Sequence, residues 1–482
     1  MRASASYIDG QWLEPDAGTT FEVRNPADTT DLVATCRQAD ADDADRAVAA
    51  AAAVTDDWAG MSGADRGAIL RRTSQELGAR KDELTDLLSR EEGKTLAEAE
   101  GEVQRAVDIF AYYAEKALDV GGTVKSAGGP DATLSTRREP LGVAGLITPW
   151  NYPIAIPAWK IAPALAAGNT VVFKPALQAP LVGGAIVECL DDAGVPDGVV
   201  NYVLGSGSEV GDAIVTHEDV DAISFTGSAA VGTQVYEAAT ADQKRAQCEM
   251  GGKNPTIVTD SADIETAVDI VGSGAFGVTG QACTACSRAI VTTDQYDEFL
   301  DGIVEYAEGL RIGDGRAGAD MGPHVSESEL EGTLRYVDVG RTEGATLATG
   351  GGVPDDEAHA DGHFVEPTVF ADVDPGMRIA QEEVFGPVLS VIEVDDFDEA
   401  IAVANDVEYG LSASVLTNDL DQAHRFVDEI EAGVAKVNEK TTGLALHVPF
   451  GGYKRSSTDT YREQGDAALD FYTSTKTVYL NY

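Results

Sequence analysis

The sequence predicts an α/β protein with two doubly wound parallel sheets and a small β arm used for oligomerisation. Short β-prone runs alternate with helical patterns from Val143 to about Glu249, and a second series of this kind runs from Thr256 to Asn438. Repeated strand–helix–strand order specifies parallel strands with helices on both faces. The tail Lys476–Tyr482 is β-prone without a partner nearby in sequence, so we expect it to pair with Thr133–Arg138 of a neighbouring subunit.

A helical layer precedes the first sheet. Asp40–Leu118 predicts three amphipathic helices, because apolar residues recur there at helical spacing. The strands of the first sheet are predicted at Gly142–Pro149, Thr170–Lys174, Val199–Gly205, Asp221–Ser228 and Lys244–Met250, and those of the second at Thr256–Asp260, Ser287–Thr293, Gly386–Val394, Ser412–Thr417 and Gly433–Asn438.

The charge balance excludes a nucleic-acid partner. Among 482 residues, 82 are acidic and 34 are basic, which gives a formal net charge of -48. Nucleic acids and anionic membrane surfaces are held by clustered Lys and Arg, and the chain has no basic run of about five to eight residues. We interpret this composition as that of a protein that stays hydrated in a cytoplasm with a very high salt concentration. The alternative is an unusually acidic protein from an organism whose cytoplasm has an ordinary salt concentration.

The cysteine pattern and the apolar segments predict a cytoplasmic protein. The five cysteines are odd in number and widely spaced, so no disulfide scaffold follows. The first residues show no apolar export signal, and the most apolar stretch, Leu141–Phe173, is broken by several prolines. His359 and His363 lie in a Gly- and Asp-rich loop that we expect to be exposed, and no metal site is predicted.

Thr279–Arg288 contains the most informative cysteine, Cys283, between small residues ahead of a strand. A nucleophilic thiol needs a base or a favourable field, because a free thiol with a pKa of about 8.5 is mostly protonated at neutral pH. Three other interpretations of the pair Cys283 and Cys286 stay open: a buried structural cysteine, half of a zinc site, or a redox centre. The zinc and redox interpretations lack the further ligands or the strand-to-helix position that they require.

Three further segments carry polar groups at strand ends. Glu249 is followed by two glycines, which allow close backbone approach. Asn151 lies between two prolines after a predicted strand, at the edge where α/β sheets bind ligands. Ser228 begins a helix, whose free N–H groups suit a phosphate. Each residue alone is equally consistent with a solvated carboxylate, a turn amide or an ordinary helix cap.

Together these segments resemble the NAD(P)-dependent aldehyde dehydrogenase superfamily over nearly the whole chain. The matching segments occur in the family's order: TPWNYP, TVVFKPA, FTGSAAVG, EMGGKNP, GQACTACSR, EEVFGPV, PFGGYKRSS and REQG. The resemblance implies that Cys283 attacks an aldehyde, that the Asn151 amide and the Cys283 backbone N–H hold the oxyanion, and that Glu249 activates water for thioester hydrolysis. Glu463 is a weaker candidate for relaying the proton.

The resemblance also implies the contacts with the cofactor. The residues implied are Trp150, Lys174, Ala176, Leu177, Gly227, Ser228, Gly232, Gly251, Glu383 and Phe385. Family members that prefer NAD often carry Glu at the position of Leu177, where it would bind the adenosine ribose. Its loss also removes repulsion against a 2′-phosphate, so we expect NADP to be favoured and NAD to be possible.

The substrate is expected from a narrower resemblance. The segments around Ile156–Ala176 and Asn438–Gly452 are most similar to the 2-oxoglutarate semialdehyde (2,5-dioxopentanoate) dehydrogenase group. A substrate with a second carboxylate needs a cation at the far end of its tunnel, for which Lys440 and His447 are candidates. The predicted tunnel wall includes Tyr152, Trp159 and Phe450. Succinic semialdehyde or a broad range of aliphatic aldehydes is the alternative.

The resemblance divides the chain into three parts and leaves two other function classes open. Residues 1–118 and 141–250 would bind the cofactor, residues 251–455 would form the catalytic domain, and residues 119–140 and 456–482 would bridge subunits in a homodimer or homotetramer. A CoA-acylating relative is disfavoured because that branch lacks the base at position 249. A catalytically silent relative is disfavoured because Cys283, Glu249 and Asn151 are all present.

Overall fold

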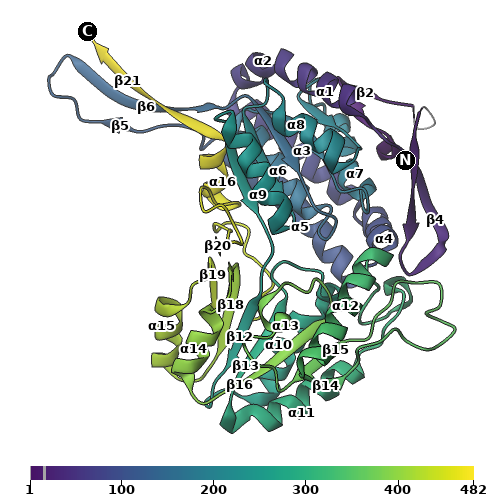
Figure 1. Cartoon of the computed structure of the whole chain (residues 1–482). Helices are drawn as coiled ribbons and strands as arrows, with labels where there is room; N and C mark the ends of the chain where they lie inside the picture. The colour runs from purple at the N-terminus through teal and green to yellow at the C-terminus, as the bar shows by residue number, and fades with distance from the viewer. Residues whose placement is uncertain (1, 15–17) are drawn as a thin grey trace.

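The computed structural model describes residues 2–14 and 18–482, which form two α/β units and a projecting β arm (Figure 1). The predicted range 1–118 includes residue 1 and residues 15–17, which lie outside the described residues. The two parallel sheets and the arm confirm the predicted fold class.

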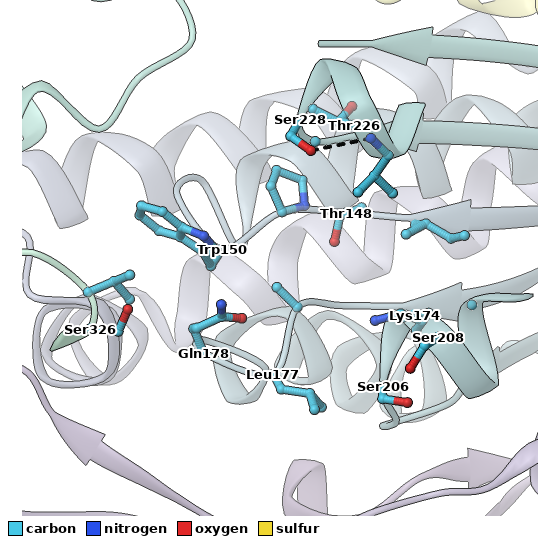
Figure 2. A pocket seen from close by; sticks show the side chains of 18 of the residues that line it. Thr148, Trp150, Lys174, Leu177, Gln178, Ser206, Ser208, Thr226, Ser228 and Ser326 are labelled. Atoms are coloured by element: carbon cyan, nitrogen blue, oxygen red, sulfur yellow. Dashed lines mark hydrogen bonds between the residues drawn. The ribbon is translucent and has the colours of Figure 1, made fainter. Parts of the chain in front are cut away.

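The first sheet runs in the order β11-β10-β7-β8-β9-β1-β2. The strands β7 (Val143–Ile147), β8 (Thr170–Lys174), β9 (Val200–Tyr202), β10 (Ala222–Thr226) and β11 (Arg245–Glu249) are parallel, and β1 (Tyr7–Ile8) and β2 (Gln11–Trp12) add an antiparallel edge. The chain moves from β7 outward to β9 and then returns to β10 on the other side of β7. Sheets of this kind bind ligands at such a change of direction. Here Thr148 directly follows β7, and Thr226 is the last residue of the neighbouring strand β10 (Figure 2).

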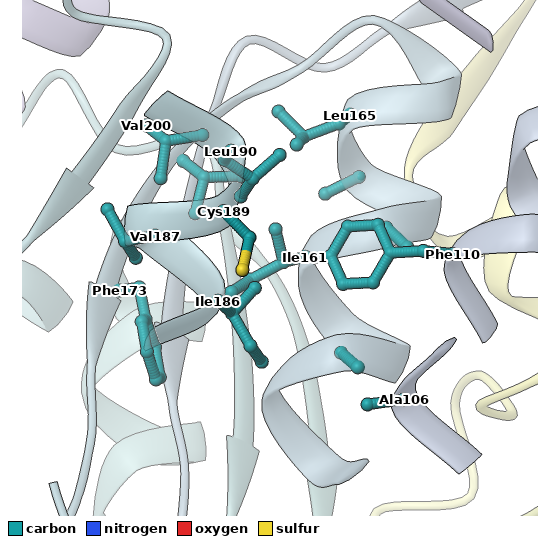
Figure 3. Close-up of a cluster of buried hydrophobic side chains, with 14 of the residues drawn as sticks. Ala106, Phe110, Ile161, Leu165, Phe173, Ile186, Val187, Cys189, Leu190 and Val200 are labelled. Atoms are coloured by element: carbon teal, nitrogen blue, oxygen red, sulfur yellow. The ribbon is translucent and has the colours of Figure 1, made fainter. Parts of the chain in front are cut away.

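Helices cover both faces of the first sheet. One face packs against α1 (Ala41–Ala53), α8 (Asp212–Thr216) and α9 (Ala229–Ala241), and the other against α3 (Gly63–Ala79), α5 (Leu96–Lys116), α6 (Ala155–Ala167) and α7 (Leu181–Asp192). In the second layer, Phe110, Ile161 and Leu165 meet Leu190 in a close-packed cluster (Figure 3). This rigid layer carries the loops that follow β7 and β8.

Three helices were predicted in Asp40–Leu118, whereas the described chain has five there. The two further helices are α2 (Thr55–Gly60) and α4 (Lys81–Glu92). The Ser62 side chain accepts from the Asp65 N–H and caps α3. Gly93, with φ of 100°, ends α4, and Thr95 opens α5 in a capping box with Glu98. The leucine pattern continues across the break between α3 and α4, because both helices face the same core.

The second sheet runs in the order β14-β15-β16-β13-β12-β18-β19 and is parallel except for β14. Its strands are β12 (Asn254–Val258), β13 (Cys286–Thr292), β14 (Thr346–Thr349), β15 (Thr368–Ala371), β16 (Val388–Val394), β18 (Ser412–Leu416) and β19 (Val434–Val437). Helices α10 (Ile264–Phe276) and α11 (Thr293–Gly309) cover one face, and α12 (Glu327–Glu343), α13 (Arg378–Gln381), α14 (Phe397–Asn405) and α15 (Leu420–Glu429) cover the other. The strands β14 and β15 were not predicted, since they are short and β14 is partly exposed.

The arm consists of β5 (Val124–Lys125), β6 (Ala132–Pro140) and β21 (Thr473–Asn481), with the C-terminus at its tip (Figure 1). The predicted pairing of the tail with Thr133–Arg138 is confirmed, but the predicted neighbouring subunit is wrong, because β21 pairs antiparallel with β6 of the same chain. Helix α16 (Gly465–Phe471) packs on α6 and places Leu469 and Phe471 in the first core. We propose the domain boundaries given above, with α16 packed on the cofactor-binding part.

The remaining strands are β3 (Thr20–Asn25), β4 (Asp28–Arg37), β17 (Tyr409–Gly410) and β20 (Tyr453–Lys454). In residues 2–14 and 18–482, none of the helices has both the length and the apolar character that crossing a membrane requires.

Candidate active site

Cys283 is half-buried in the segment between the 3-10 turn Gly277–Gly280 and β13. The Asn254 amide, at the start of β12, donates to the Cys283 carbonyl at 2.8 Å and to the Ala285 carbonyl at 2.9 Å. A Cβ atom at Gly252 would lie 2.7 Å from the Cys283 carbonyl oxygen, so only glycine allows this approach. The start of the second sheet therefore fixes the backbone of Cys283.

A cavity of about 950 Å³ lies at the switch point of the first sheet (Figure 2). The predicted cofactor residues that line it are Trp150, Lys174, Ala176, Leu177, Gly227 and Ser228. The buried hydroxyls of Thr148 and Thr226 have no hydrogen-bond partner within the described residues. Ser228 caps the 13-residue helix α9, whose positive end faces this cavity. Unpaired donors and a helix N-terminus fit a bound dinucleotide.

Lys174 and Leu177 set the chemistry of one end of this cavity. Burial lowers the pKa of Lys174 to about 8, and its ammonium group donates to the Pro175 carbonyl at 2.8 Å. Leu177 lies beside Gln178, while Ser206 and Ser208 face the same space (Figure 2). Hydroxyls, an amide and one buried lysine thus line this cavity.

A smaller cavity of about 170 Å³ connects this region with Cys283. It shares Trp150, Gly227 and Ser228 with the large cavity and adds the predicted residues Asn151, Gly251, Glu383 and Phe385. The rings of Trp150 and Phe385 meet edge to face, with centroids 5.5 Å apart. The Glu383 carboxylate accepts from the Gly252 N–H at 3.0 Å, and burial raises its pKa to about 7.

Gly251 and Gly232, both predicted to contact the cofactor, have different surroundings. A Cβ atom at Gly251 would lie 2.0 Å from the Glu383 carboxylate, so this glycine makes room for a residue of the cavity. Gly232 does not line either cavity; a Cβ atom there would lie 2.6 Å from the Met250 sulfur. Gly232 thus allows close packing of α9 against Met250, and its direct contact with the cofactor stays a prediction.

Asn151 is buried beside the Cys283 segment. Its amide donates one N–H to the Gln281 carbonyl at 2.9 Å and leaves its second N–H for another acceptor. The Lys94 ammonium group donates to the Asn151 carbonyl and lies 3.0 Å from the Glu102 carboxylate. This network fixes Asn151 from both its main chain and its side chain.

Glu249 is the last residue of β11 and is buried. Its carboxylate accepts from the Ser457 hydroxyl at 3.0 Å and from the Gly452 N–H at 3.2 Å. Burial, followed by the charge of Glu463, raises the pKa of Glu249 well above its ordinary value. The sequence analysis missed Ser457, and the proximity of its hydroxyl to Glu249 has no signal in residue spacing.

Glu463 lies in the same buried group of side chains. Its carboxylate pairs with the Lys160 ammonium group, which also donates to the Ser224 hydroxyl at 2.7 Å. The second Glu463 carboxylate oxygen is buried without a hydrogen-bond partner in the described part of the chain. A chain of polar groups thus extends behind Glu249, between α6 and β10.

The two cysteines of the GQACTACSR segment have different surroundings. Burial, together with the charges of Glu383 and Glu249, raises the pKa of the Cys283 thiol to about 12. Cys286 is buried, and its thiol donates to the Thr256 hydroxyl at 3.2 Å. Both thiols are free. Cys283 alone of the two lines the cavities, so it is the one that a small molecule can reach.

A third cavity, of about 360 Å³, reaches Cys283 from the other side. The predicted substrate residues Tyr152, Trp159, Lys440 and Phe450 line it, together with Glu98, Glu102 and Arg105 of α5. The α5 residues were missed, because α5 is an amphipathic helix with several other polar residues, and nothing in the sequence separates these three from residues that face solvent. Cys283 thus lies between a large cavity for one ligand and a small cavity for another.

His447 does not line the substrate cavity, and its predicted contact with the substrate stays a prediction. The side chain is exposed, and the main chain of its loop packs against Gly465, whose N–H donates to the Leu446 carbonyl at 3.2 Å.

The other two predicted loop histidines are half-buried rather than exposed, which corrects the expectation for both. His359 pairs with Asp356 and meets the ring of Phe364, and His363 lines the large cavity. Over residues 2–14 and 18–482, no group of three or more His, Cys, Asp or Glu side chains could hold a metal ion.

Comparisons with known proteins agree with this geometry. The aldehyde dehydrogenase family profile matches residues 12–478. The chain is 61% identical to an alpha-ketoglutarate semialdehyde dehydrogenase of Haloferax volcanii over 99% of both chains, and 44% identical to an alpha-ketoglutaric semialdehyde dehydrogenase of Bacillus subtilis over 98% of this chain and 97% of the relative.

A solved structure has the same fold. The betaine aldehyde dehydrogenase of Staphylococcus aureus, crystallised in complex with NAD+, superposes with a TM-score of 0.96 at 36% identity and covers 99% of this chain and 95% of its own. The family profile, the full-length relatives and the arrangement of cavities around Cys283 agree. This chain belongs to the aldehyde dehydrogenase family.

Proposed function

We propose that this protein oxidises 2,5-dioxopentanoate to 2-oxoglutarate with NAD(P), without transfer to CoA. The observation that carries the proposal is the position of Cys283, between a cavity fit for a dinucleotide and a smaller cavity with cationic residues. Two relatives that match nearly the whole chain, at 61% and 44% identity, have names that specify this semialdehyde. Glu249 supplies the base that hydrolysis requires and that acyl transfer to CoA does not.

The first step forms a bond between sulfur and carbon. The Cys283 thiol loses its proton to water, and the sulfur adds to the aldehyde carbon while the carbonyl electron pair moves to oxygen. The free N–H of the Asn151 amide and the Cys283 backbone N–H donate to that oxyanion. Each such donor contributes about 3 kcal/mol to the lowering of the barrier.

The two connected cavities at the switch point would hold the cofactor. Lys174 and Ser228 would bind its ribose and phosphates, Glu383 would bind the nicotinamide ribose, and Trp150 and Phe385 would line the space beside the ring. The chemistry that it supplies when bound is acceptance of a hydride from the carbon attached to sulfur. NADP is favoured over NAD, because Leu177 offers no carboxylate to repel a 2′-phosphate.

The last step breaks the bond between sulfur and carbon. Glu249 takes a proton from water as the water oxygen adds to the thioester carbon, and the Cys283 sulfur then leaves as a thiolate. In the observed arrangement the Glu249 carboxylate is bound to Ser457 and Gly452, so its side chain has to turn away from them to reach the thioester. Glu463, with Lys160, receives the proton afterwards.

We also infer that the protein works in the cytoplasm as a homodimer or homotetramer and that its acidic surface suits concentrated salt. The projecting arm exposes Val124, Tyr479, Leu480 and Tyr482, which a second copy would cover. Light scattering in molar KCl is expected to give two or four chains per particle. A particle of one chain would refute the inferred assembly.

A substrate panel tests the function. Rates of NADP and NAD reduction in molar KCl are measured with 2,5-dioxopentanoate, succinic semialdehyde, glycolaldehyde and pentanal. We expect kcat/KM to be highest for 2,5-dioxopentanoate and higher with NADP than with NAD. Cys283→Ala lowers kcat by about 10⁴-fold or more, because the nucleophile is lost, while Cys36→Ala serves as a control at a remote buried cysteine.

Each result of the panel has a separate meaning. Similar kcat/KM values for all four aldehydes would refute the substrate, and faster reduction of NAD would refute the cofactor preference. Turnover by Cys283→Ala at the wild-type rate would refute the mechanism.

The Ser457 hydroxyl is expected to set the pH dependence of thioester hydrolysis. Its hydrogen bond favours the charged form of Glu249 and therefore lowers the pKa of that carboxyl. Ser457→Ala removes the bond, the pKa of Glu249 rises further, and the basic form appears only at higher pH. One hydrogen bond is worth about 1 kcal/mol, so the acid limb of the hydrolysis rate moves upward by about 0.5–1 pH unit.

The measurement is the rate at which the thioester decays, determined at a series of pH values after rapid mixing of enzyme, cofactor and aldehyde. Ser457→Thr keeps a hydroxyl, so the acid limb of its pH–rate profile is expected to stay at the wild-type position. A limb that stays in place in Ser457→Ala, or that moves to lower pH, contradicts the assigned role.

A further inference from the structure

The wall of the substrate cavity carries charges of both signs. Lys94, Glu98, Glu102 and Arg105 come from α5 and the residues just before it, and Lys440 comes from the loop after β19. A substrate with a carboxylate can use only a cation whose charge is not already matched. For each of the five charged groups, the contacts within the protein decide whether its charge is already neutralised.

Lys94 is matched. Its ammonium group lies 3.3 Å from Glu92 and 3.0 Å from Glu102, and it is fully enclosed over the ring of Tyr152. Glu102 also accepts the N–H groups of Ile154 and Ala155, at 3.1 Å and 3.0 Å. Lys94 and Glu102 thus hold the start of α6 and the Asn151 turn.

Glu98 is also occupied by the protein itself. Its carboxylate accepts from the Thr95 N–H at 3.0 Å in the capping box of α5 and from the Val278 N–H at 2.6 Å. Both acids of this wall therefore accept N–H groups of the main chain, which reduces their repulsion of an anionic ligand.

The positive charge of Arg105 has no carboxylate paired with it among the described residues. Arg105 forms no ion pair within 4.0 Å among residues 2–14 and 18–482, although it is half-buried and lines the cavity. Its hydrogen-bond partner is neutral: the guanidinium donates to the Gln464 amide oxygen at 3.0 Å. Asp108, one turn further along α5, is exposed and accepts from the Gln104 amide at 2.9 Å.

Gln464 is a strained and fully buried partner. Its backbone has φ of 62° and ψ of 170°, an arrangement that costs a residue other than glycine about 1–3 kcal/mol. It follows Glu463, whose main chain exchanges two 2.7 Å hydrogen bonds with Phe450 of the cavity wall. The guanidinium is therefore tied to the wall beside Phe450, and the contacts within the described chain leave most of its five N–H donors for a ligand.

We propose that Arg105, positioned by Gln464, binds the carboxylate of an aldehyde substrate at the end remote from Cys283. The inference rests on the proposed function and names the residue that gives it specificity for oxo acids. A guanidinium presents paired N–H groups that match a carboxylate. Direct contact is required, because the protein carries a net charge of -48 and salt screens longer-range attraction, with a Debye length of about 3 Å at 1 M.

Lys440, one of two candidates in the sequence analysis, is the weaker anchor. It is exposed, so its ammonium group stays hydrated, whereas Arg105 is held on a helix and by a buried amide. The two cations can be separated by substitution.

The test compares Arg105→Met, Arg105→Lys and Lys440→Met, with Arg335→Met as a matched control on the exposed surface of α12. For each protein, kcat and KM are measured with 2,5-dioxopentanoate and with pentanal, which has five carbons and no carboxylate. We expect Arg105→Met to raise KM for 2,5-dioxopentanoate by about 100-fold and to change kcat/KM for pentanal by less than about threefold. Arg105→Lys recovers part of the loss, and Lys440→Met has a smaller effect than Arg105→Met.

An equal loss for both aldehydes would make Arg105 a structural residue, and an unchanged KM for 2,5-dioxopentanoate would remove it as the anchor. Either result overturns the inference, as does a larger effect of Lys440→Met. Unchanged thermal midpoint and NADP affinity in Arg105→Met, measured in the same molar KCl, confirm that the variant is folded.

A second readout is independent of the physiological substrate. If wild-type protein oxidises pentanal as well as 2,5-dioxopentanoate, the proposed function fails, and 2-oxoglutarate is then used as a competitive inhibitor of pentanal oxidation. Weaker inhibition of Arg105→Met by about 100-fold supports the carboxylate anchor, and equal inhibition of both proteins overturns it.

Discussion

The site depends on the close approach of the segment Glu249–Asn254 to Glu383 and to the Cys283 main chain. Glu249 ends the first sheet and Asn254 begins the second, so the glycines between them carry the chain across. Gly251 leaves space for Glu383, and Gly252 leaves space for the Cys283 carbonyl, which the Asn254 amide then holds. A side chain at either glycine would separate the groups that meet there.

The crossing explains why charge is concentrated in a region with little water. Glu249, Glu383 and Glu463 are brought together by the meeting of the two units, and Lys160 is the cation paired with Glu463. Burial raises the pKa of Glu249 and of Glu383 and also that of the Cys283 thiol. Each of these shifts favours the protonated form of the group over its charged form, because the charged form is penalised by burial.

The sequence was sufficient for the central parallel strands of both sheets and for residues that lie in short motifs at strand ends. Thr170–Lys174 was predicted with the observed bounds of β8, because a buried parallel strand reads as a continuous apolar run. Cys283, Glu249 and Asn151 occupy one region, as the resemblance implied, although their roles remain proposals. The sequence was less informative where the outcome depended on contacts between distant segments: β21 pairs with the predicted segment, but in its own chain, and the side chain of His447 is exposed.

Ser457 and Arg105 show what sequence alone did not reveal. Ser457 reaches Glu249 across 208 positions, and its hydroxyl is not distinguishable in sequence from any loop serine. Arg105 lies on an amphipathic helix, where a cation normally faces solvent; only the absence of a carboxylate partner among the described residues, together with the cavity, distinguishes it.

The central claim is that Glu249 hydrolyses a thioester carried by Cys283, and rapid mixing of Glu249→Gln with NADP and 2,5-dioxopentanoate tests it most directly. The account predicts a burst of about one reduced cofactor per Cys283, followed by almost no turnover, and an acyl group on the Cys283 peptide by mass spectrometry. Steady turnover of Glu249→Gln at the wild-type rate, or a burst without an acylated Cys283 peptide, would contradict it.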